Sequence, residues 1–254
     1  LAATLDRDNE PTAPGTPLPP LWHWLYFLER PYEQHLGIDG LGRGGLLPPV
    51  QLPVLMWAQG DLRFHRPLQL GSRVTRRSRV ADIRAKQGRS GPLVFVQLEH
   101  VLDDGGGPLI VETQDIVFRA IGGQAGRPDS VVRTAHWDEW FTPSAVLLFR
   151  YSALTFNSHR IHYDQAYARS VEGYPDPVVQ GPLLATLLAE ALRRHHPHAR
   201  LASFSYRSLL PLYMNCPIRL NGRVETDNQI SLWAKDREGR TGMTAIAGLQ
   251  PADY

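Results

Sequence analysis

The first half of the chain alternates apolar and polar residues with a period of two, which is typical of β-strands that have one buried face. In the clearest example, Val94, Val96 and Leu98 alternate with residues that include Gln97 and Glu99. Clusters of glycine, proline and aspartate separate such segments, as hairpin turns do. We therefore predict strands over Leu62–Phe64, Arg73–Ile83, Leu93–Leu102 and Leu109–Phe118.

The second half contains a strongly apolar helical pattern before a series of strands of its own. Over Gly181–Arg194, leucine and alanine recur at the spacing that makes one buried stripe on a helix. A shorter helix is predicted over Asp164–Glu172, where Asp164 can cap the first turn. An aromatic-rich helix is predicted over Leu21–Leu36 in the first half. The predicted strands of the second half are Val146–Tyr151, Leu201–Leu209, Pro217–Glu225, Gln229–Lys235 and Thr241–Leu249.

A helix followed by strands thus occurs twice, with the first helix reduced. Strands that follow a helix with tight turns between them form an antiparallel sheet with the helix on one face, so we predict a duplicated α+β fold. Composition sets the boundaries: an extended arm over residues 1–20, an N-terminal half over 21–120, a linker over 121–135 and a C-terminal half over 136–254.

Composition also narrows the possible partners. The 254 residues include 27 Lys+Arg, of which only Lys86 and Lys235 are lysine, and 25 Asp+Glu, so the net charge is only +2. Basic residues are dense only from Arg73 to Arg89, which a solvated strand face explains better than a nucleic-acid surface. A site for a phosphate-bearing small molecule stays open. With a period of two, one face of this strand carries Arg73, Arg77 and Arg79, and the other carries Val74, Arg76 and Val80.

Several classes of protein are excluded at this stage. The single cysteine, Cys216, allows neither a disulfide framework nor a cysteine metal cluster within one chain. No apolar run approaches the roughly 20 residues of a membrane-spanning helix. Leu1–Thr16 lacks the pattern of a signal peptide, although the chain starts at Leu and a removed leader stays open. We expect a cytoplasmic protein that binds neither nucleic acid nor membrane.

One segment, Thr155–Asp164, concentrates residues that can carry chemistry, and three interpretations of its histidines are open. His159, His162 and Asp164 could converge on a metal ion, although no H-E-x-x-H helix supports this and we expect no metal. His162 could act as a general acid/base, because imidazole titrates near neutral pH. His162 could also be a loop histidine with only a structural hydrogen bond.

The start of the apolar helix favours the acid/base interpretation. Gly181 opens this helix and Pro182 lies in its first turn. Free backbone N–H groups and the positive end of the helix dipole can stabilise a developing oxyanion there. Glycine also lets a ligand approach the backbone closely. A histidine loop together with such a helix start fits chemistry at a thioester carbonyl and its α and β carbons.

These residues resemble a known family. Asn157–His162 (NSHRIH) is similar to the D-x-N-x-x-H motif of MaoC-like, R-specific enoyl thioester hydratases, and Val179–Leu183 (VQGPL) is similar to their V-H-G-x-L helix start. FNSHRIHYD, with Lys86–Val96 and Leu47–Leu68, resembles more narrowly the hydroxyacyl-thioester dehydratase type 2 branch. Its single-chain double hotdogs include mesaconyl-C4-CoA and itaconyl-CoA hydratases. The likeness covers most of residues 20–249 and implies a double hotdog, two tandem antiparallel sheets that each wrap a helix.

The resemblance implies roles for individual residues. His162 falls on the family's catalytic histidine, Asn157 on its catalytic aspartate, and Gly181 on the glycine whose N–H polarises the thioester carbonyl. The sequence departs from the motif in three places: Asn157 cannot ionise, His159 replaces an asparagine and Gln180 replaces a histidine. We therefore expect His162 to make the proton transfers while Asn157 orients the water by hydrogen bonds.

The implied activity is the reversible addition of water to a 2-enoyl-CoA thioester, with a short dicarboxylic acyl group such as mesaconyl-C4-CoA or itaconyl-CoA. The thioester itself acidifies the α C–H, so no cofactor is expected beyond the coenzyme A of the substrate. Two alternatives stay open: a hotdog acyl-CoA thioesterase and a non-catalytic acyl-thioester binding module. The N-terminal half is expected to shape the acyl-CoA channel, and two hotdogs in one chain fit a monomer or a homodimer.

Four further residues are candidates for substrate binding. Arg160 could pair with a free carboxylate of the substrate, or it could form a surface salt bridge with Asp164. Gln180 borders the helix start, and Lys86 and Arg89 could meet the phosphates of coenzyme A.

Overall fold

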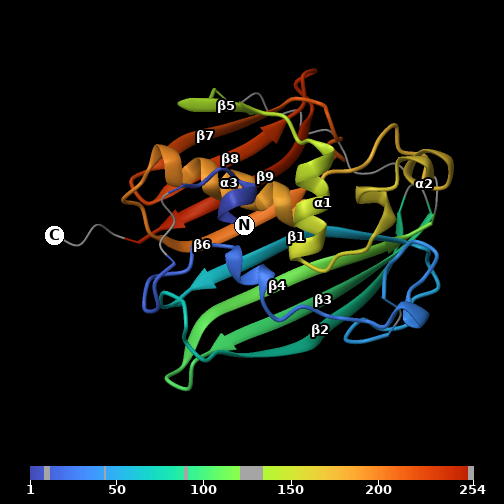
Figure 1. The fold of residues 1–254 in the computed structure, drawn as a ribbon, viewed down its shortest axis with the longest axis horizontal. Coiled ribbons are helices and arrows are strands. Elements are labelled where there is room, and N and C mark those ends of the chain that lie inside the picture. Colours follow the sequence, from blue (N-terminus) through green and yellow to red (C-terminus); the bar gives the residue numbers. More distant parts are fainter. Residues whose placement is uncertain (9–11, 43, 89–90, 121–133, 251–254) are drawn as a thin grey trace.

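The computed structural model describes residues 1–8, 12–42, 44–88, 91–120 and 134–250, and Figure 1 draws them as a ribbon. The strands are β1 (Val54–Phe64), β2 (Thr75–Gly88), β3 (Gly91–Asp103), β4 (Pro108–Arg119), β5 (Trp137–Phe141), β6 (Leu201–Ser208), β7 (Ile218–Thr226), β8 (Gln229–Lys235) and β9 (Thr241–Leu249). The α-helices are α1 (Ala145–Leu154), α2 (Gln165–Ser170) and α3 (Gly181–His195).

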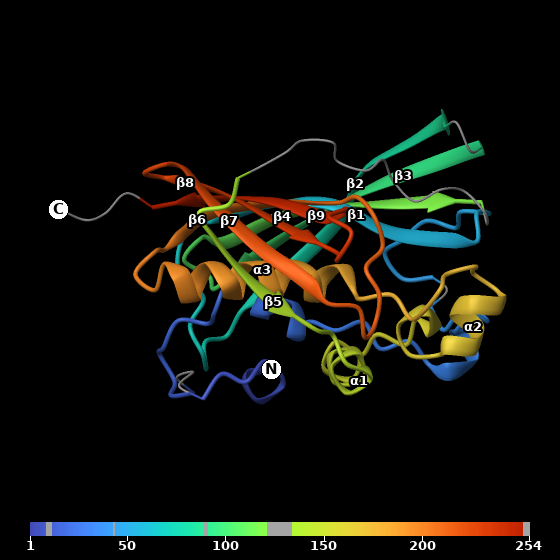
Figure 2. The same ribbon diagram turned by 90° about the horizontal axis from the view of Figure 1, so that it is seen from above.

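All these strands belong to one antiparallel sheet, in the order β2-β3-β4-β1-β6-β9-β8-β7-β5. The two halves meet where β1 pairs with β6, and the fully buried Leu62 lies opposite the fully buried Phe204. The two series of strands are therefore one continuous sheet. Turned by 90°, the molecule shows α1, α2 and α3 on the same side of this sheet (Figure 2). The predicted α+β architecture is confirmed.

The period of two places the strands of the first half well. In β3, the side chains of Val96, Leu98, His100 and Leu102 are buried while those between them are more exposed. β1 begins well before the predicted Leu62–Phe64, because its first residues form a continuous apolar run in which no alternation can be detected.

The apolar helix of the second half is confirmed as α3, which packs across β7, β8 and β9. Its leucines are buried as the spacing predicts, with Leu183 and Leu188 fully buried, but the burial extends beyond one stripe to every residue from Leu183 to Leu192. Each such leucine contributes about 2 kcal/mol to the free energy of unfolding. Among the described residues, neither this helix nor any other combines the length and apolar character needed to cross a membrane.

The predicted strand over Val146–Tyr151 is wrong, because these residues lie in α1. Ser144 caps this helix by accepting a hydrogen bond from the N–H of Leu147 at 3.1 Å. Leu147, Leu148 and Tyr151 are buried at helical spacing, which a short apolar run in the sequence does not distinguish from a strand. The short edge strand β5 was not predicted.

The predicted helix over Leu21–Leu36 is also wrong. Only two 3-10 turns form there, at Trp22–Leu25 and Glu33–His35. Phe27 has a left-handed φ of 56°, and the intervening Pro31 lacks the N–H that a continuous helix needs. Most of the predicted linker over 121–135 lies outside the described residues.

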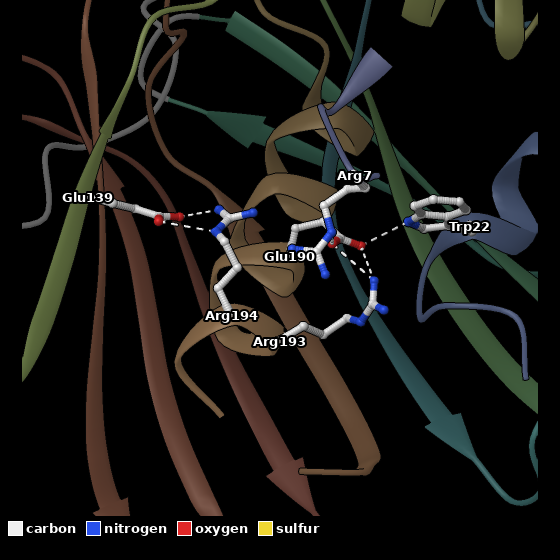
Figure 3. A network of polar contacts seen from close by, with 6 residues as sticks. All are labelled: Arg7, Trp22, Glu139, Glu190, Arg193 and Arg194. Carbon is white, nitrogen blue, oxygen red and sulfur yellow. Dashed lines mark hydrogen bonds and ion pairs between the residues drawn. The ribbon is translucent and has the colours of Figure 1, made fainter. Parts of the chain in front are cut away.

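A buried carboxylate on α3 ties the N-terminal segment to the C-terminal half (Figure 3). Glu190, 1% exposed, accepts a hydrogen bond from Trp22 Nε1 at 2.9 Å and another from Arg193 Nη1 at 2.9 Å. Arg7 Nε lies 3.5 Å from its other oxygen. Because an unpaired buried charge is costly, these donors fix the first residues of the chain against the helix.

Candidate active site

A cavity of about 480 Å³ opens between the two halves of the molecule. The C-terminal half contributes the loop between α1 and α2 and the start of α3. The N-terminal half contributes β1 to β4 and the segment that contains the two 3-10 turns. Residues used below that line the cavity are His23, Trp24, Phe27, Trp57, Arg76, His100, Glu112, Gln114, Asn157, His159, His162 and Gly181.

His162 is held in one orientation at the wall of this cavity. Its Nδ1 lies 2.7 Å from the carbonyl oxygen of Val178, so Nδ1 carries the hydrogen and donates it. The second ring nitrogen, Nε2, makes no hydrogen bond to a described residue. In the neutral ring, Nε2 therefore offers its lone pair to whatever occupies the cavity.

Burial keeps this imidazole neutral. The side chain is 7% exposed, and burial lowers the pKa of His162 to about 4, although the hydrogen bond to Val178 acts in the opposite direction. Near neutral pH the ring is consequently a base that can accept a proton. His159 packs edge-on against it, with ring centroids 5.3 Å apart, and limits its rotation.

Asn157 faces the same cavity from the same loop. Its Oδ1 accepts a hydrogen bond from the backbone N–H of His159 at 3.0 Å, and its backbone N–H donates to the carbonyl of Ser152 at 2.8 Å. The bond from His159 identifies which end of the side-chain amide is the oxygen, so the amide nitrogen is the end without a described partner. Phe156, just before it, has a left-handed φ of 51°, which makes the turn that aims Asn157.

The N-terminal half fixes this loop from outside. Ser158 Oγ donates to the carbonyl of Gly40 at 2.6 Å, and the N–H of Arg160 donates to the carbonyl of Asp39 at 2.8 Å. Gly40 has a φ of 81°, and a Cβ there would overlap the carbonyl oxygen of Ser158. The segment around Gly40 therefore packs closely against the loop Thr155–Asp164, which we call the catalytic loop candidate.

The start of α3 offers a backbone donor to the cavity. The N–H of Gly181 makes no hydrogen bond to a described residue, no side chain caps this end, and Pro182 has no N–H. A Cβ on Gly181 would lie 2.6 Å from Trp57 Cε3, so only glycine fits beneath this ring. The helix start can thus accept a negatively charged oxygen, as its sequence predicts.

Aromatic rings from both halves support that helix start. Trp57 of β1 stacks on Tyr206 of β6, with ring centroids 4.0 Å apart and planes 14° from parallel. Trp24 packs edge-on against Trp57 at 5.5 Å. Gly60, beside Tyr206, leaves room for the phenol ring, since a Cβ there would overlap its hydroxyl. Tryptophan rings therefore pack between the two halves.

A buried polar cluster in the N-terminal half was missed by sequence reasoning. Glu112 is 2% exposed; its Oε1 accepts from Trp24 Nε1 at 2.9 Å and from Gln114 Nε2 at 2.6 Å, and its Oε2 lies 3.1 Å from His23 Nε2. Burial alone would raise the pKa of Glu112, but the bonds from His23 and Gln114 outweigh it and hold the pKa below its usual value. The sequence did contain one signal for this carboxylate. Glu112 lies two residues after Ile110 in a predicted strand, so both side chains point to the same face of the sheet.

The structure does not bring all the predicted substrate-binding residues to the cavity. Arg160 pairs with Asp164 at 2.7 Å and stacks on Tyr167, which is the surface salt bridge foreseen as its alternative. The carboxylate of Asp164, which the metal interpretation included, is thus engaged by Arg160. Gln180 is fully buried and donates to the carbonyl of Leu148, behind the cavity wall.

The predicted phosphate contacts are not located by the described residues either. Lys86 is exposed, lies over the ring of Phe95 at 5.3 Å and does not line the cavity. Arg89 lies outside the described residues. Of the predicted site residues, the three assigned to catalysis line the same cavity: His162, Asn157 and Gly181.

The chain matches the protein family "Hydroxyacyl-thioester dehydratase type 2" over residues 21–214. It is 43% identical to a protein of Chloroflexus aurantiacus named mesaconyl-C(4)-CoA hydratase, over 98% of this chain and 89% of that protein. A mitochondrial hydroxyacyl-thioester dehydratase type 2 of Schizosaccharomyces pombe is 31% identical, over 81% of this chain and 77% of that protein.

Among solved structures, a MaoC-like dehydratase from Phytophthora capsici superposes with a TM-score of 0.65 at 19% identity. The match covers 84% of this chain and 80% of that one. At this identity the likeness concerns the fold alone, and it confirms the predicted hotdog fold. The two predicted sheets are joined into one, and the described residues of the N-terminal half form no α-helix.

Proposed function

Because the chain belongs to the hydroxyacyl-thioester dehydratase type 2 family, we propose that it catalyses the reversible hydration of a 2-enoyl-CoA thioester. We propose that the acyl group of this substrate is a short dicarboxylic one, and that mesaconyl-C4-CoA is the best candidate for the thioester. The near full-length similarity to a protein named for that substrate supports this choice.

The observation that carries the mechanism is the position of His162. Its Nδ1 hydrogen is committed to Val178 at 2.7 Å, so Nε2 is the nitrogen that acts in the cavity. Nε2 takes a proton from water while the water oxygen bonds to Cβ of the substrate. The Asn157 amide nitrogen, which has no described partner, donates a hydrogen bond that orients this water.

The electrons of the C=C bond move toward the thioester as the water adds. Negative charge develops on the carbonyl oxygen, where the N–H of Gly181 and the positive end of α3 stabilise it. The imidazolium of His162 then returns its proton to Cα. One O–H bond of water and the π bond of C=C are broken, and one C–O and one C–H bond are formed, so the step balances without an added reactant. This route requires no metal and no redox cofactor, because the thioester itself stabilises the developing carbanion.

The test follows the loss of enoyl absorbance when the protein is mixed with mesaconyl-C4-CoA and, separately, with crotonyl-CoA. We expect His162→Ala to lower kcat by about 100- to 10,000-fold, the range for loss of a general acid/base. His65→Ala, which changes an exposed histidine outside the cavity, should retain full activity.

Three outcomes would contradict the proposal. Release of free thiol without loss of the enoyl group would indicate a thioesterase. Tight binding of thioesters without turnover would indicate a binding module. Unchanged turnover in His162→Ala would remove His162 from the mechanism.

A further inference from the structure

One cationic side chain of the basic segment points inward. Of the described basic residues between positions 73 and 89, only Arg76 lines the cavity. The period of two along β2 accounts for this, since Arg76 is half-buried on the inner face while its neighbours Thr75 and Arg77 are exposed.

Among the described residues, no carboxylate neutralises the charge of Arg76. None lies within 4.0 Å of its guanidinium, whose Cζ is 5.6 Å from the centroid of the Phe27 ring. Glu112, the buried carboxylate of the same wall, is already occupied by Trp24, Gln114 and His23. A half-buried guanidinium facing a cavity without an internal partner is arranged for an external one.

His100 adds a second polar group beside Arg76. On the paired strands β2 and β3, His100 lies opposite Ser78, so Arg76 is its diagonal neighbour on the same face. Its Nδ1 is engaged with Ser78 Oγ at 2.7 Å, whereas Nε2 has no described partner. Burial lowers the pKa of His100; Arg76 acts in the same direction and the charge of Glu112 opposes both.

We propose that Arg76, with His100 beside it, binds the free carboxylate of the dicarboxylic acyl group. This inference rests on the proposed function and replaces Arg160, which the sequence suggested for this role. A guanidinium suits a carboxylate because it can donate two parallel hydrogen bonds. Leu98, Leu102 and Phe27 line the cavity together with Arg76, and such apolar walls favour a short acyl group over the phosphates of coenzyme A.

The test compares two thioesters that differ only at one group. 3-Methylcrotonyl-CoA carries a methyl group where mesaconyl-C4-CoA carries its carboxylate. We would measure kcat/KM for mesaconyl-C4-CoA and the competitive inhibition constant of 3-methylcrotonyl-CoA against it. The inhibition constant does not require that 3-methylcrotonyl-CoA itself be hydrated. Both values are compared among Arg76→Met, Arg76→Lys and the unmodified protein. Arg77→Gln, on the outer face of the same strand, is the matched control.

We expect Arg76→Met to lower kcat/KM for mesaconyl-C4-CoA by about 10- to 100-fold, as for loss of a charged hydrogen bond. The inhibition constant of 3-methylcrotonyl-CoA should change by less than about threefold, because that ligand has no carboxylate. Arg76→Lys should recover part of the loss, and Arg77→Gln should match the unmodified protein. Thermal unfolding at the same temperature in all variants shows that folding is retained.

Equal losses for both thioesters would overturn the inference and place Arg76 against a coenzyme A phosphate. No loss for either would remove Arg76 from binding altogether. If the unmodified protein hydrates neither thioester, the proposed function fails on its own. The dissociation constants of the two thioesters, measured by calorimetry, then still decide whether Arg76 recognises the carboxylate.

Discussion

Trp57 of β1 lies directly over Gly181, the first residue of α3, so that a Cβ on Gly181 would stand 2.6 Å from Trp57 Cε3. The contact joins the N-terminal half to the Gly181 backbone N–H, a donor that faces the cavity from the helix start. Since Trp57 is itself stacked on Tyr206, it has little freedom to move away.

Gly181→Ala should therefore displace the helix start and its N–H group. We expect kcat/KM for the enoyl thioester to fall by about 100-fold or more, the loss typical for one oxyanion donor. Steady-state kinetics would measure it. Gly106→Ala, in the turn between β3 and β4, meets only the flexible ends of Asp104 and Arg66 and should keep its activity. Equal activity in both variants would contradict the role of Gly181.

The rate should depend on pH in a way set by His162. The neutral imidazole is the active form, so protonation at low pH removes activity. Because burial lowers the pKa of His162 to about 4, the acid limb of kcat/KM should lie near that pH, well below the 6.5 of an ordinary histidine. A profile of kcat/KM from about pH 4 to 8 tests this, and a limb centred at about 6.5 would be at odds with a buried neutral base.

Asn157→Asp restores the carboxylate of the family motif and should change the titration of His162. A negative charge in the same cavity favours the imidazolium, so the pKa of His162 should rise and the acid limb should move to higher pH. Asn157→Ala removes the amide without adding charge; it should lower kcat while leaving the limb in place. An unmoved limb in Asn157→Asp would show that the two side chains do not interact.

Gly40 provides a test of how the N-terminal half holds the catalytic loop candidate. Gly40→Ala combines a φ of 81° with overlap onto Ser158, whereas Gly15→Ala has a φ of 85° and open space around it. We expect Gly15→Ala to cost only the backbone strain, about 1 kcal/mol of the free energy of unfolding. Gly40→Ala should cost more and should also lower kcat. Denaturant unfolding and steady-state kinetics on both variants would separate the cost of backbone strain from the cost of the overlap with Ser158. Equal losses of stability and of kcat in the two variants would show that the overlap has no effect.

The carboxylate in Figure 3 should matter for stability rather than for chemistry. Glu190→Ala leaves Trp22 Nε1 without its partner in a buried place, and it removes the partner of Arg7 and Arg193. We expect a loss of about 3 kcal/mol in the free energy of unfolding. Glu139→Ala, which breaks the more exposed pair with Arg194 on the same helix, should cost less than about 1 kcal/mol. Chemical denaturation would compare them.

The sequence indicated which three candidate residues line one cavity, because they lie close together in the chain or in a recognisable motif. His162 and Asn157 share one loop, and Gly181 marks a helix start by its position before Pro182. β3 was predictable because its two faces differ in burial, which gives the period of two. α3 was predictable because leucine and alanine recur in it at helical spacing, although every residue from Leu183 to Leu192 is buried.

The other wall of the cavity depends on contacts between distant segments. Trp24 and Glu112 meet only because the 3-10 turn Trp22–Leu25 lies against β4, and no local pattern indicates that contact. The period of two already placed Arg76 on the face of Val74 and Val80, but it did not show what that face meets. Only the pairing of Arg160 with Asp164 and the position of Arg76 in the cavity wall separate the two as candidate carboxylate ligands.

The pairing of β1 with β6 inside a single chain has a consequence for how such a protein can change. In a symmetric dimer of identical halves, every substitution appears twice and alters both sites at once. Here the half that holds Glu112 and Arg76 varies independently of the half that holds His162. Mutations can therefore change the wall that contains Arg76, which we propose to face the acyl group, while His162, the proposed acid/base, stays unaltered.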